Sequence, residues 1–230
     1  MREIVLDTET TGFEPAEGHR IVEIGAIELL NHMPTGRVYH QYINPERAMP
    51  KEAFEVHGLG DDFLRDKPPF AAVGMAFLDF IGVDSRLVIH NAAFDMKFLN
   101  AELGWANLPI IAMDRALDTV AIARRKFPGS PASLDALCRR FAIDNSAREK
   151  HGALLDSELL AEVYLELIGG RQPDFGLSVA GGGTGQTSTE AWRPGLRPAP
   201  LPPRLSADEA DAHARLIESL GETAIWKRFA

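Results

Sequence analysis

The chain has 230 residues, 45% of them hydrophobic, and a formal net charge of -9 at pH 7. This length and composition fit one globular domain with an appended segment, and no apolar stretch is long enough to cross a bilayer. The excess acid lies within residues 1–170, which hold 17 Lys and Arg against 26 Asp and Glu, so we expect weak nonspecific affinity for a polyanion.

Apolar segments of two kinds alternate along residues 1–170. Patterns typical of strands cover residues 4–6, 21–30, 38–43, 87–89 and 109–113. Segments with helical spacing cover residues 70–80, 92–103, 116–126, 133–141 and 153–167. Three strands come first, and helices and strands then mix, which predicts an α/β domain with a mixed sheet covered by helices.

The pattern changes near residue 170. Residues 171–205 lack periodicity and are rich in Gly and Pro, which predicts a flexible linker. Residues 206–230 predict a terminal helix, because Ser206 and Glu209 have the spacing of a capping box and apolar residues follow at helical intervals. A segment this short cannot bury its own apolar face, so it either packs on the domain or docks on another protein.

Two carboxylates stand at the end of the first predicted strand. Asp7 and Glu9 project from the same face, and burying two like charges together is costly unless a cation sits between them. Asp95 is expected in the first turn of a helix, where the helix dipole also favours acids. Asp156 lies early in another helix and His151 just before it, positions that a solvated acid and an exposed loop histidine also occupy. Together the five residues predict a site for a hard divalent cation and a metal-dependent reaction on phosphate.

These residues carry a resemblance to a known family. The motifs are Asp7-x-Glu9, Asp95 within residues 90–100, and His151 with four residues before Asp156. They resemble the DEDDh exonucleases and, within them, the proofreading ε subunits of bacterial DNA polymerase III. Further agreeing segments are residues 20–26, 56–59, 118–119, 126–129 and 133–138. The resemblance covers residues 1–170 and implies an RNase H-like exonuclease fold with a five-stranded mixed sheet flanked by helices. It also implies a 3′-5′ exodeoxyribonuclease that removes misincorporated nucleotides as 5′-monophosphates.

The resemblance also implies how the site works. Asp7, Glu9 and Asp156 would bind two divalent cations, Mg²⁺ or Mn²⁺, and Asp95 would complete the acidic cluster through water. His151 is expected to be the general base that takes a proton from the attacking water, since histidine changes its charge near neutral pH. The expected chemistry is hydrolysis with two metal ions on the scissile phosphate.

Two further residues are expected to contact the terminal nucleotide. The resemblance implies that Thr10 and His57 bind substrate together with Asp7, Glu9 and Asp156. Thr10 lies in a Thr-Thr-Gly turn that offers backbone amides and a small residue for close approach, although an ordinary strand-end turn has the same composition. By itself, a histidine at a helix end, such as His57, is more often structural.

The acidic charge and the tail both indicate that partners deliver the substrate, a single-stranded or frayed DNA 3′ end. Residues 206–230 resemble the segment that binds the polymerase α subunit, and a short flexible tether raises the effective concentration to about the millimolar range. The peptide from Gln172 to Leu177 resembles a sliding-clamp binding peptide, although this motif is weak. A small accessory subunit on the exonuclease domain is a further expected partner, and no membrane contact is expected.

Two other functions remain open on the sequence. A stand-alone DNA or RNA trimming exonuclease is disfavoured by the linker and the capped terminal helix, and a non-catalytic polymerase scaffold is disfavoured by the intact set of five site residues. No basic and apolar leader precedes Asp7, and the single Cys138 cannot form an internal disulfide. We therefore expect a cytoplasmic protein in which Cys138 is a packing residue.

Overall fold

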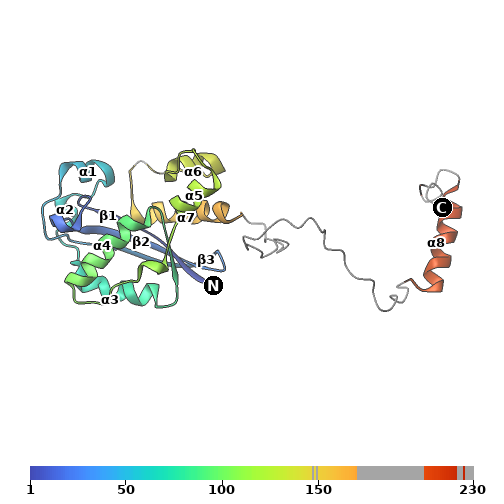
Figure 1. Cartoon of the computed structure of the whole chain (residues 1–230), viewed down its shortest axis with the longest axis horizontal. Coiled ribbons are helices and arrows are strands. Elements are labelled where there is room, and N and C mark those ends of the chain that lie inside the picture. Colours follow the sequence, from blue (N-terminus) through green and yellow to red (C-terminus); the bar gives the residue numbers. More distant parts are fainter. Residues whose placement is uncertain (147, 149, 170–204, 222–224, 226–230) are drawn as a thin grey trace, which may run out of the picture. The chain divides into compact units, whose positions relative to one another are not determined.

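The computed structural model describes residues 1–146, 148, 150–169, 205–221 and 225, which fall into two units (Figure 1). The first unit holds the described residues up to 169 and contains the sheet. The second holds the described residues from 205 and contains helix α8, Ala207–Ser219. Except for Leu205, the predicted linker lies outside the described residues, as does the clamp-like peptide from Gln172 to Leu177. The division of the chain at residues 170 and 205 therefore stays a prediction.

A mixed sheet of five strands forms the centre of the first unit, which confirms the predicted fold class. Its strands are β1 Arg2–Thr10, β2 Ile21–Leu30, β3 Met33–Tyr42, β4 Arg86–Ile89 and β5 Ala116–Asp118. They lie in the order β3-β2-β1-β4-β5, with β2 antiparallel to β1 and β3, and with β4 parallel to β1 and β5. The pairing of β1 with β4 stops at Val5 opposite Val88. Asp7 and Glu9 therefore lie beyond the end of β4.

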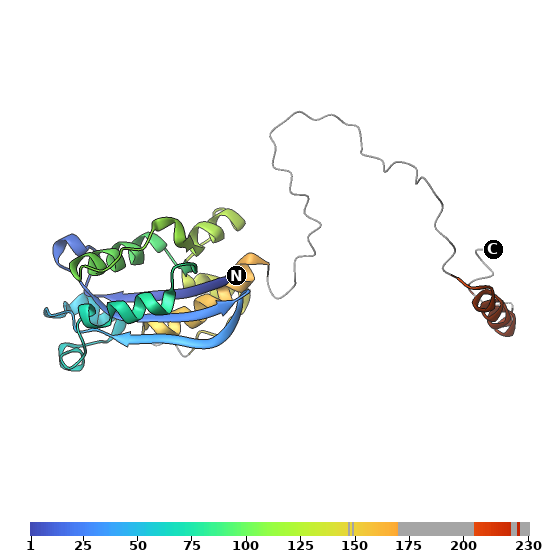
Figure 2. The ribbon, with the colours of Figure 1, turned by 90° about the horizontal axis from the view of Figure 1, so that it is seen from below.

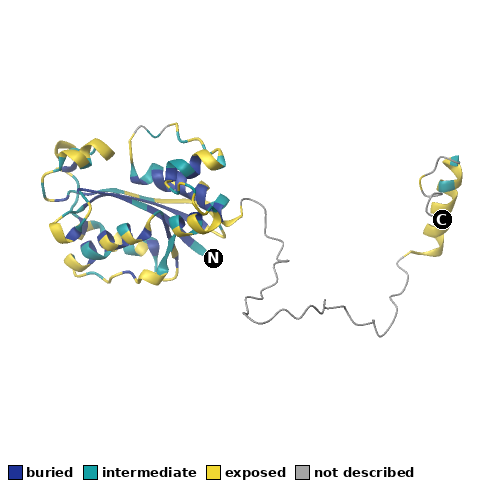
Figure 3. Cartoon of the chain, turned by 45° about the horizontal axis from the view of Figure 1, so that its top comes forward, coloured by how far each residue is buried: buried dark blue, intermediate teal, exposed yellow. Residues whose placement is uncertain are grey.

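Helices cover both faces of this sheet (Figures 1 and 2). They are α1 Lys51–His57, α2 Asp61–Leu64, α3 Phe70–Ile81, α4 Ala92–Trp105, α5 Thr119–Lys126, α6 Leu134–Phe141 and α7 Ala153–Ile168, with the 3-10 turns η1 Pro15–Glu17 and η2 Met113–Arg115. Helices α3 and α4 pack on one face, and α5, α6 and α7 pack on the other. Figure 3 shows buried positions gathered on most of the sheet and on the helix sides that face it, whereas β3 is largely exposed.

The alternation of β1 divides the core into two clusters. Ile4 and Leu6 lie in the cluster with α3 and α4, whereas Val5 lies in the cluster with α5, α6 and α7. Side chains two residues apart on a strand share a face, so Asp7 and Glu9 continue the series of Val5. The two carboxylates therefore project to the side of the sheet that α7 covers.

The prediction of a strand at residues 109–113 is wrong. This apolar run is a loop held by α4: the Ile111 N–H donates to Asn100 Oδ1 at 2.7 Å, and Asn100 Nδ2 donates to the Ile111 carbonyl oxygen at 2.9 Å. The side-chain amide satisfies the backbone groups that a neighbouring strand would otherwise bind. Apolar character alone does not distinguish such a docked loop from a strand.

The helix predicted at residues 116–126 begins too early. Its first three residues form β5, and α5 starts at Thr119. Asp118 marks the change, because its side chain accepts a hydrogen bond from the Val120 N–H at 2.9 Å and so caps the helix. A strand of three residues is too short to give a periodic signal. The short helices α1 and α2 were not predicted either, and within them only His57 and Leu64 are buried.

Helix α8 has the capping box that the sequence predicts. The Ser206 hydroxyl accepts from the Glu209 N–H at 3.3 Å, and the Glu209 carboxylate accepts from the Ser206 N–H at 2.9 Å. Leu216 and Leu220 are exposed on this helix, so its apolar face is open to solvent in the second unit. Among the described helices, none combines the length and apolar character needed to span a bilayer.

Candidate active site

The predicted catalytic residues meet in one cavity of about 280 Å³ in the first unit. Its lining consists of Asp7, Thr8, Glu9, His90, Phe94, Asp95, Ser133, Leu134, Asp135, Arg148, His151 and Asp156. The cavity lies where β1 continues past the carboxyl end of β4, a usual place for ligand sites beside parallel strands. Of the seven predicted site residues, five line this cavity, whereas Thr10 and His57 do not.

The β1 side contributes two carboxylates and faces a third on β2. Glu9 is buried and Asp7 is partly buried. In the register of β1 and β2, Glu9 lies opposite Glu23, and Asp7 lies opposite Gly25. Opposite residues of an antiparallel pair share a face, so Glu23 adds its carboxylate next to that of Glu9. His40 on β3 binds this extra acid, with its Nε2 2.7 Å from Glu23 Oε1.

Asp95 reaches the cavity from helix α4. The chain turns from β4 into this helix at Asn91, whose φ of 68° is in the left-handed region that Asn tolerates, and Asp95 lies in the first turn, as predicted. Thr8 then fixes the carboxylate to β1. The N–H and the hydroxyl of Thr8 both donate to Asp95 Oδ1, at 3.1 and 2.8 Å. Two elements far apart in sequence are thereby joined at the site.

Burial and crowding raise the pKa of three of the four carboxyl groups. Burial, followed by the charge of Asp95, raises the pKa of Asp7 well above its ordinary value. Burial, followed by the charge of Asp156, raises the pKa of Glu9 to about 8. Burial also raises the pKa of Asp95 to about 7, although the hydrogen bonds from Thr8 act in the opposite direction. The β1 side therefore holds carboxyl groups whose negative charges lack compensation.

The donor set fits a divalent cation. One possible ligand atom from each of Glu9, His151 and Asp156 lies within 4.8 Å of the others. Carboxylate oxygens are the ligands that hard cations prefer, and a bound cation reverses the pKa rise that crowding causes. A cation here would favour the ionised forms of Glu9 and Asp95, which the surroundings otherwise oppose. The residues thus form a candidate metal site of carboxylates and one histidine.

We call Asp156, His151 and Arg148 the α7 side of the cavity, and here the positive charge of Arg148 compensates the carboxylate. Asp156 lies in the first turn of α7, and both of its oxygens accept from Arg148: Nε donates to Oδ1, and Nη2 donates to Oδ2 at 2.6 Å. The remaining nitrogen, Nη1, donates to Asp135 Oδ1 at 2.8 Å. Burial acts to raise the pKa of Asp156, but the neighbouring His151 and Arg148 outweigh it and lower that pKa below its ordinary value.

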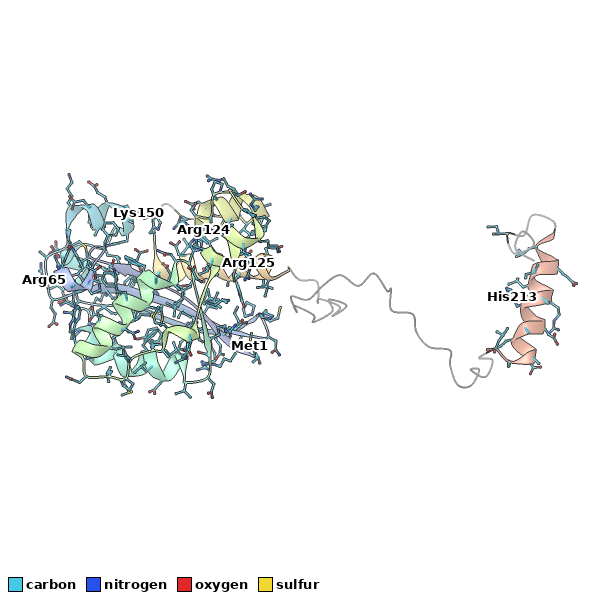
Figure 4. All side chains as sticks on the ribbon, viewed as in Figure 1. Met1, Arg65, Arg124, Arg125, Lys150 and His213 are labelled. Atoms are coloured by element: carbon cyan, nitrogen blue, oxygen red, sulfur yellow. The ribbon has the colours of Figure 1, made fainter. Side chains whose placement is uncertain are left out.

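His151 stands at the mouth of the cavity, with its side chain 50% exposed. Its backbone N–H donates to the Val56 carbonyl oxygen of α1 at 3.2 Å, which ties the loop before α7 to that helix. Its Nδ1 lies 2.7 Å from Arg148 Nη2 and 3.3 Å from Asp156 Oδ2. Figure 4 labels the preceding residue, Lys150, which lies between α1 and the start of α7.

Gly25 lets the start of α7 approach the sheet. A Cβ on this residue would lie 2.3 Å from the carbonyl carbon of Ala153 and from the nitrogen of Leu154, so no larger residue fits without moving the helix backbone. Ser157 closes the contact, because its hydroxyl lies 3.0 Å from the Gly25 carbonyl oxygen. Since Gly25 is opposite Asp7 in the strand register, this close approach brings Asp156 to the β1 carboxylates.

Two of the predicted substrate residues, Thr10 and His57, lie outside the lining of the cavity. The Thr10 hydroxyl donates to the Gly12 carbonyl oxygen at 2.6 Å, which holds the turn after β1. His57 is buried at the end of α1, where its Nδ1 accepts from the Leu59 N–H at 3.0 Å. Burial lowers the pKa of His57, and its Nε2, although near the Thr10 backbone, makes no hydrogen bond of normal geometry with a described residue.

Gly25, Glu23 and Arg148 were not predicted as site residues. Gly25 and Glu23 had a signal, because each interrupts the apolar run of β2 with a residue that a buried strand does not favour. Arg148 had none: it is one basic residue in an irregular loop, and only the return of this loop to α7 brings it to Asp156.

Comparison with known sequences identifies relatives along nearly the whole chain. The profile of the exonuclease family matches residues 4–164. The DNA polymerase III subunit epsilon of Rickettsia felis is 48% identical over 227 residues, which cover 97% of this chain and 99% of that protein. The corresponding subunit of Rickettsia conorii is 57% identical over 178 residues, 76% of this chain and 77% of the relative. That of Escherichia coli K12 is 50% identical over 177 residues, 74% of this chain and 72% of the relative.

Solved exonucleases have the same fold. The nuclease domain of 3′hExo, a DEDDh family member bound to rAMP, superposes with a TM-score of 0.62 and 20% identity over 73% of this chain and 91% of that one. E. coli exonuclease I in complex with a dA16 oligonucleotide gives a TM-score of 0.63 and 17% identity, over 73% and 40%. These structures are similar in fold, and the sequence matches define the family. The chain therefore belongs to the exonuclease family and, within it, to the epsilon subunits of DNA polymerase III.

Proposed function

We propose that this chain is the proofreading 3′-5′ exonuclease subunit of a replicative DNA polymerase, which removes misincorporated nucleotides as 5′-monophosphates in the cytoplasm. One observation carries the proposal: Asp7, Glu9, Asp95, His151 and Asp156 line a single cavity in a chain that aligns with an epsilon subunit over 97% of its length. A non-catalytic scaffold has no use for this complete set of groups around one cavity.

The carboxylates are proposed to hold two divalent cations. Asp7, Glu9 and Asp156 would bind them directly, and Asp95 would contribute through water. Mg²⁺ and Mn²⁺ both suit oxygen ligands of this kind. When bound, such ions supply charge that stabilises the scissile phosphate and lowers the pKa of an attacking water. The raised pKa values of Asp7, Glu9 and Asp95 support this assignment, because they reflect negative charges that a cation would compensate.

His151 is proposed to be the general base. Its ring stands half exposed at the mouth of the cavity, beside Asp156, where it can take a proton from an attacking water and release it to solvent. The carboxylate of Asp156 beside it would stabilise the imidazolium that forms. Loss of the imidazole would therefore slow the chemical step more than it weakens substrate binding.

The 3′-terminal nucleotide is proposed to bind next to the carboxylates, against Thr10 and His57. Two observations support this placement. The turn of Thr10 to Gly12 follows directly on the strand that carries Asp7 and Glu9. His57 Nε2 is buried without a hydrogen-bond partner among the described residues, and such an atom costs about 1–3 kcal/mol. A hydroxyl or phosphate oxygen of the substrate would supply the missing partner.

Partners are proposed to bring the DNA to this acidic protein. Residues 206–230 would bind the polymerase α subunit through the apolar face of α8, which the exposed Leu216 and Leu220 support. The peptide from Gln172 to Leu177 would bind the sliding clamp, and a small accessory subunit would bind the exonuclease domain. The net charge of -9 supports such delivery, because the free chain would attract a polyanion poorly.

Degradation of DNA with a matched or a mismatched 3′ end tests the proposal. The full chain and a form that ends at Gly170 would be assayed with Mg²⁺, with and without the polymerase α subunit. We expect stepwise shortening from the 3′ end, release of 5′-monophosphates, and stimulation of the full chain only. Equal stimulation of both forms would refute the tether, and an inactive full chain would refute the exonuclease assignment. Equal cleavage of RNA, with no effect of the polymerase, would instead favour a stand-alone trimming enzyme.

A further inference from the structure

Arg148 occupies a position that the proposed mechanism leaves unexplained. Its side chain is 7% exposed, and it forms a two-pronged contact with Asp156, the carboxylate that α7 contributes to the site. This fork is the strongest geometry between a guanidinium and a carboxylate. Asp156 also belongs to the three-residue cluster with Glu9 and His151 whose ligand atoms lie within 4.8 Å of one another. A protein cation and a metal ion would therefore compete for the same carboxylate.

The same guanidinium also engages His151. Arg148 Nη2 lies 2.7 Å from His151 Nδ1, and a guanidinium can only donate, so Nδ1 must accept. Nδ1 cannot at the same time donate to Asp156 Oδ2, which lies 3.3 Å away. A neutral ring then carries its proton on Nε2, and its only lone pair points at Arg148. In this arrangement no ring nitrogen is free to accept a proton from water.

Arg148 also binds Asp135 and lines a second cavity. Its Nη1 donates to Asp135 Oδ1 at 2.8 Å, a bond that does not involve the proposed metal ligands. Together with Asp135 and His151, Arg148 forms part of the wall between the acidic cavity and an adjoining cavity of about 340 Å³. The other residues of that second cavity are Arg139, Asn145 and Lys150, two of which are basic. Phosphate is the ligand chemistry that suits these groups.

We propose that Arg148 is a positioning residue that exchanges partners: without metal it holds Asp156 and His151 together, and in the loaded site it releases both and binds a backbone phosphate of the substrate. This rests on the proposed function in one respect, the role of Asp156 as a metal ligand. Asp135 keeps the guanidinium at the wall of the two cavities during the exchange. In the free enzyme Arg148 thus occupies the lone pair of the base, His151. The site becomes competent for catalysis when Arg148 releases Asp156 and His151.

Metal affinity is the direct test. If Arg148 competes with the metal for Asp156, removing Arg148 raises the metal affinity; if Arg148 supports the metal site, removing it lowers the affinity. Binding of Mn²⁺ alone to the full chain would be measured by electron paramagnetic resonance for the wild type and Arg148→Gln. We expect Arg148→Gln to bind Mn²⁺ about tenfold more tightly, the size of one lost charge-assisted hydrogen-bonded contact. The matched control is Arg139→Gln, which removes an equal charge from an exposed residue of the adjoining cavity that pairs with no described residue. It should change the affinity by less than about twofold, as expected for a screened surface charge.

Substrate affinity should move in the other direction. With saturating Mg²⁺, we expect the KM of Arg148→Gln for a single-stranded oligonucleotide to rise about fivefold or more, the loss of one phosphate contact. A purely structural role for Arg148 would weaken metal and DNA binding together. Arg148→Lys keeps the charge but not the fork, so we expect a smaller gain in Mn²⁺ affinity, and this variant decides the question if Arg148→Gln does not fold.

Two results would overturn the exchange. One is Mn²⁺ binding by Arg148→Gln, or by Arg148→Lys if only that variant folds, that equals or falls below the wild-type value. The other is an equal gain in Arg139→Gln, which would reduce the effect to general electrostatics. Asp156→Asn separates this from the proposed function: unchanged Mn²⁺ affinity in that variant would refute the metal assignment itself, whatever Arg148 does.

Discussion

The two sides of the acidic cavity hold their carboxylates in opposite electrostatic states. On the β1 side, burial and neighbouring charges raise the pKa of Asp7 and bring that of Glu9 to about 8. On the α7 side, the hydrogen bonds to Asp156 overcome burial and lower its pKa. Both sides are shielded from solvent, so the difference comes from His151 and Arg148 beside Asp156, whereas no cationic side chain of the described residues hydrogen-bonds to Asp7 or Glu9.

This difference separates two ways of preparing a metal site. The β1 carboxylates are placed by a strand whose core residues are already buried, so the fold itself enforces their repulsion. Asp156 depends on a loop and on the first turn of α7, and the guanidinium of Arg148 stabilises it there. Repulsion on the β1 side should therefore lower the stability of the metal-free protein. The contact of Asp156 with Arg148 on the α7 side should lower the affinity of the site for metal.

The largest contrast is expected between Asp7→Asn and Asp156→Asn. Each should lower metal-dependent cleavage by about 10³-fold or more, because each removes a proposed metal ligand. Their effects on the metal-free protein should differ in sign. Asp7→Asn removes a repelling charge and should raise the Tm, whereas Asp156→Asn leaves the buried Arg148 with Asp135 as its remaining carboxylate partner and should cost about 3 kcal/mol. Thermal unfolding in EDTA checks this, and a shift of the same sign in both variants would contradict the comparison.

His151→Ala should have the next largest effect. We expect kcat to fall by about 10²–10³-fold, the usual contribution of a general base. Binding of Mn²⁺ and of a DNA 3′ end should stay largely intact, because the carboxylates of both sides remain. Single-turnover cleavage and Mn²⁺ titration measure the two properties separately. Full activity in this variant would refute the role of His151 as the base.

The sequence was sufficient to name five residues that line the acidic cavity, Asp7, Glu9, Asp95, His151 and Asp156, and to predict most of the sheet. Asp7 and Glu9 followed from strand periodicity, and Asp95 from its place at a helix start, because local rules fix both. Their assembly with His151 and Asp156 followed from the family resemblance, since spacing alone does not bring segments about 140 residues apart together. Long-range contacts decided what remained.

The wrong strand prediction and the site residues that were not predicted have causes in long-range contacts. The run at residues 109–113 is a loop because Asn100 satisfies the backbone of Ile111, a contact that no local pattern contains. Arg148 reaches Asp156 only through an irregular loop, so its role depends on tertiary structure. Gly25 was visible as a glycine within an apolar strand, but its use became clear only with the backbone of α7 against it.

Gly25→Ala tests whether the close contact of the two sides matters. The added methyl group would lie 2.3 Å from the backbone of Ala153, so the start of α7 must move away from β2. We expect a loss of about 1–3 kcal/mol in stability and a fall of roughly tenfold in kcat, because Asp156 moves with the helix.

The matched control is Gly104→Ala, at a helical glycine of α4 where a Cβ meets nothing within 4 Å. It should be neutral or stabilise the protein by up to about 1 kcal/mol. Wild-type kinetics in Gly25→Ala would show that the distance between the two sides is not critical. Urea unfolding and steady-state cleavage of one oligonucleotide provide both measurements.

The metal-free protein should lose stability as the pH rises. Glu9 and Asp95 have folded-state pKa values of about 8 and 7, above the values near 4 of an unfolded chain. Between these limits the folded state binds more protons, so the contribution of Glu9 and Asp95 to stability is complete below pH 4 and decreases as the pH rises toward 8. We expect a loss of roughly 2–5 kcal/mol between pH 5.5 and 8.5, the lower figure if Asp95 alone titrates, or about 4–20 °C in Tm. Excess Mg²⁺ should remove most of this loss.

Glu9→Gln is the control for this pH dependence, because it removes the group with the value of about 8 and should flatten the curve measured in EDTA. Asp156 does not contribute in this range, since its pKa is lowered from an ordinary value that already lies below the range. A wild-type Tm that rises steadily from pH 5.5 to 8.5 would contradict the assignment of uncompensated charge to the β1 side.

The smallest effect is expected from Glu23→Gln, which acts on the β1 side without touching a proposed metal ligand. Glu23 lies opposite Glu9, and its charge is among the causes that raise the pKa of Glu9. Removing it should let Glu9 ionise at lower pH, so Mn²⁺ should bind about two- to threefold more tightly at pH 6, where protons compete, and almost unchanged at pH 9. Glu28→Gln is the matched control: Glu28 is also a buried acid of β2, but it pairs with Arg2 at the other end of the strand. An equal gain in both variants, or a gain that persists at pH 9, would mean that net charge, and not the proton on Glu9, limits loading of the β1 side.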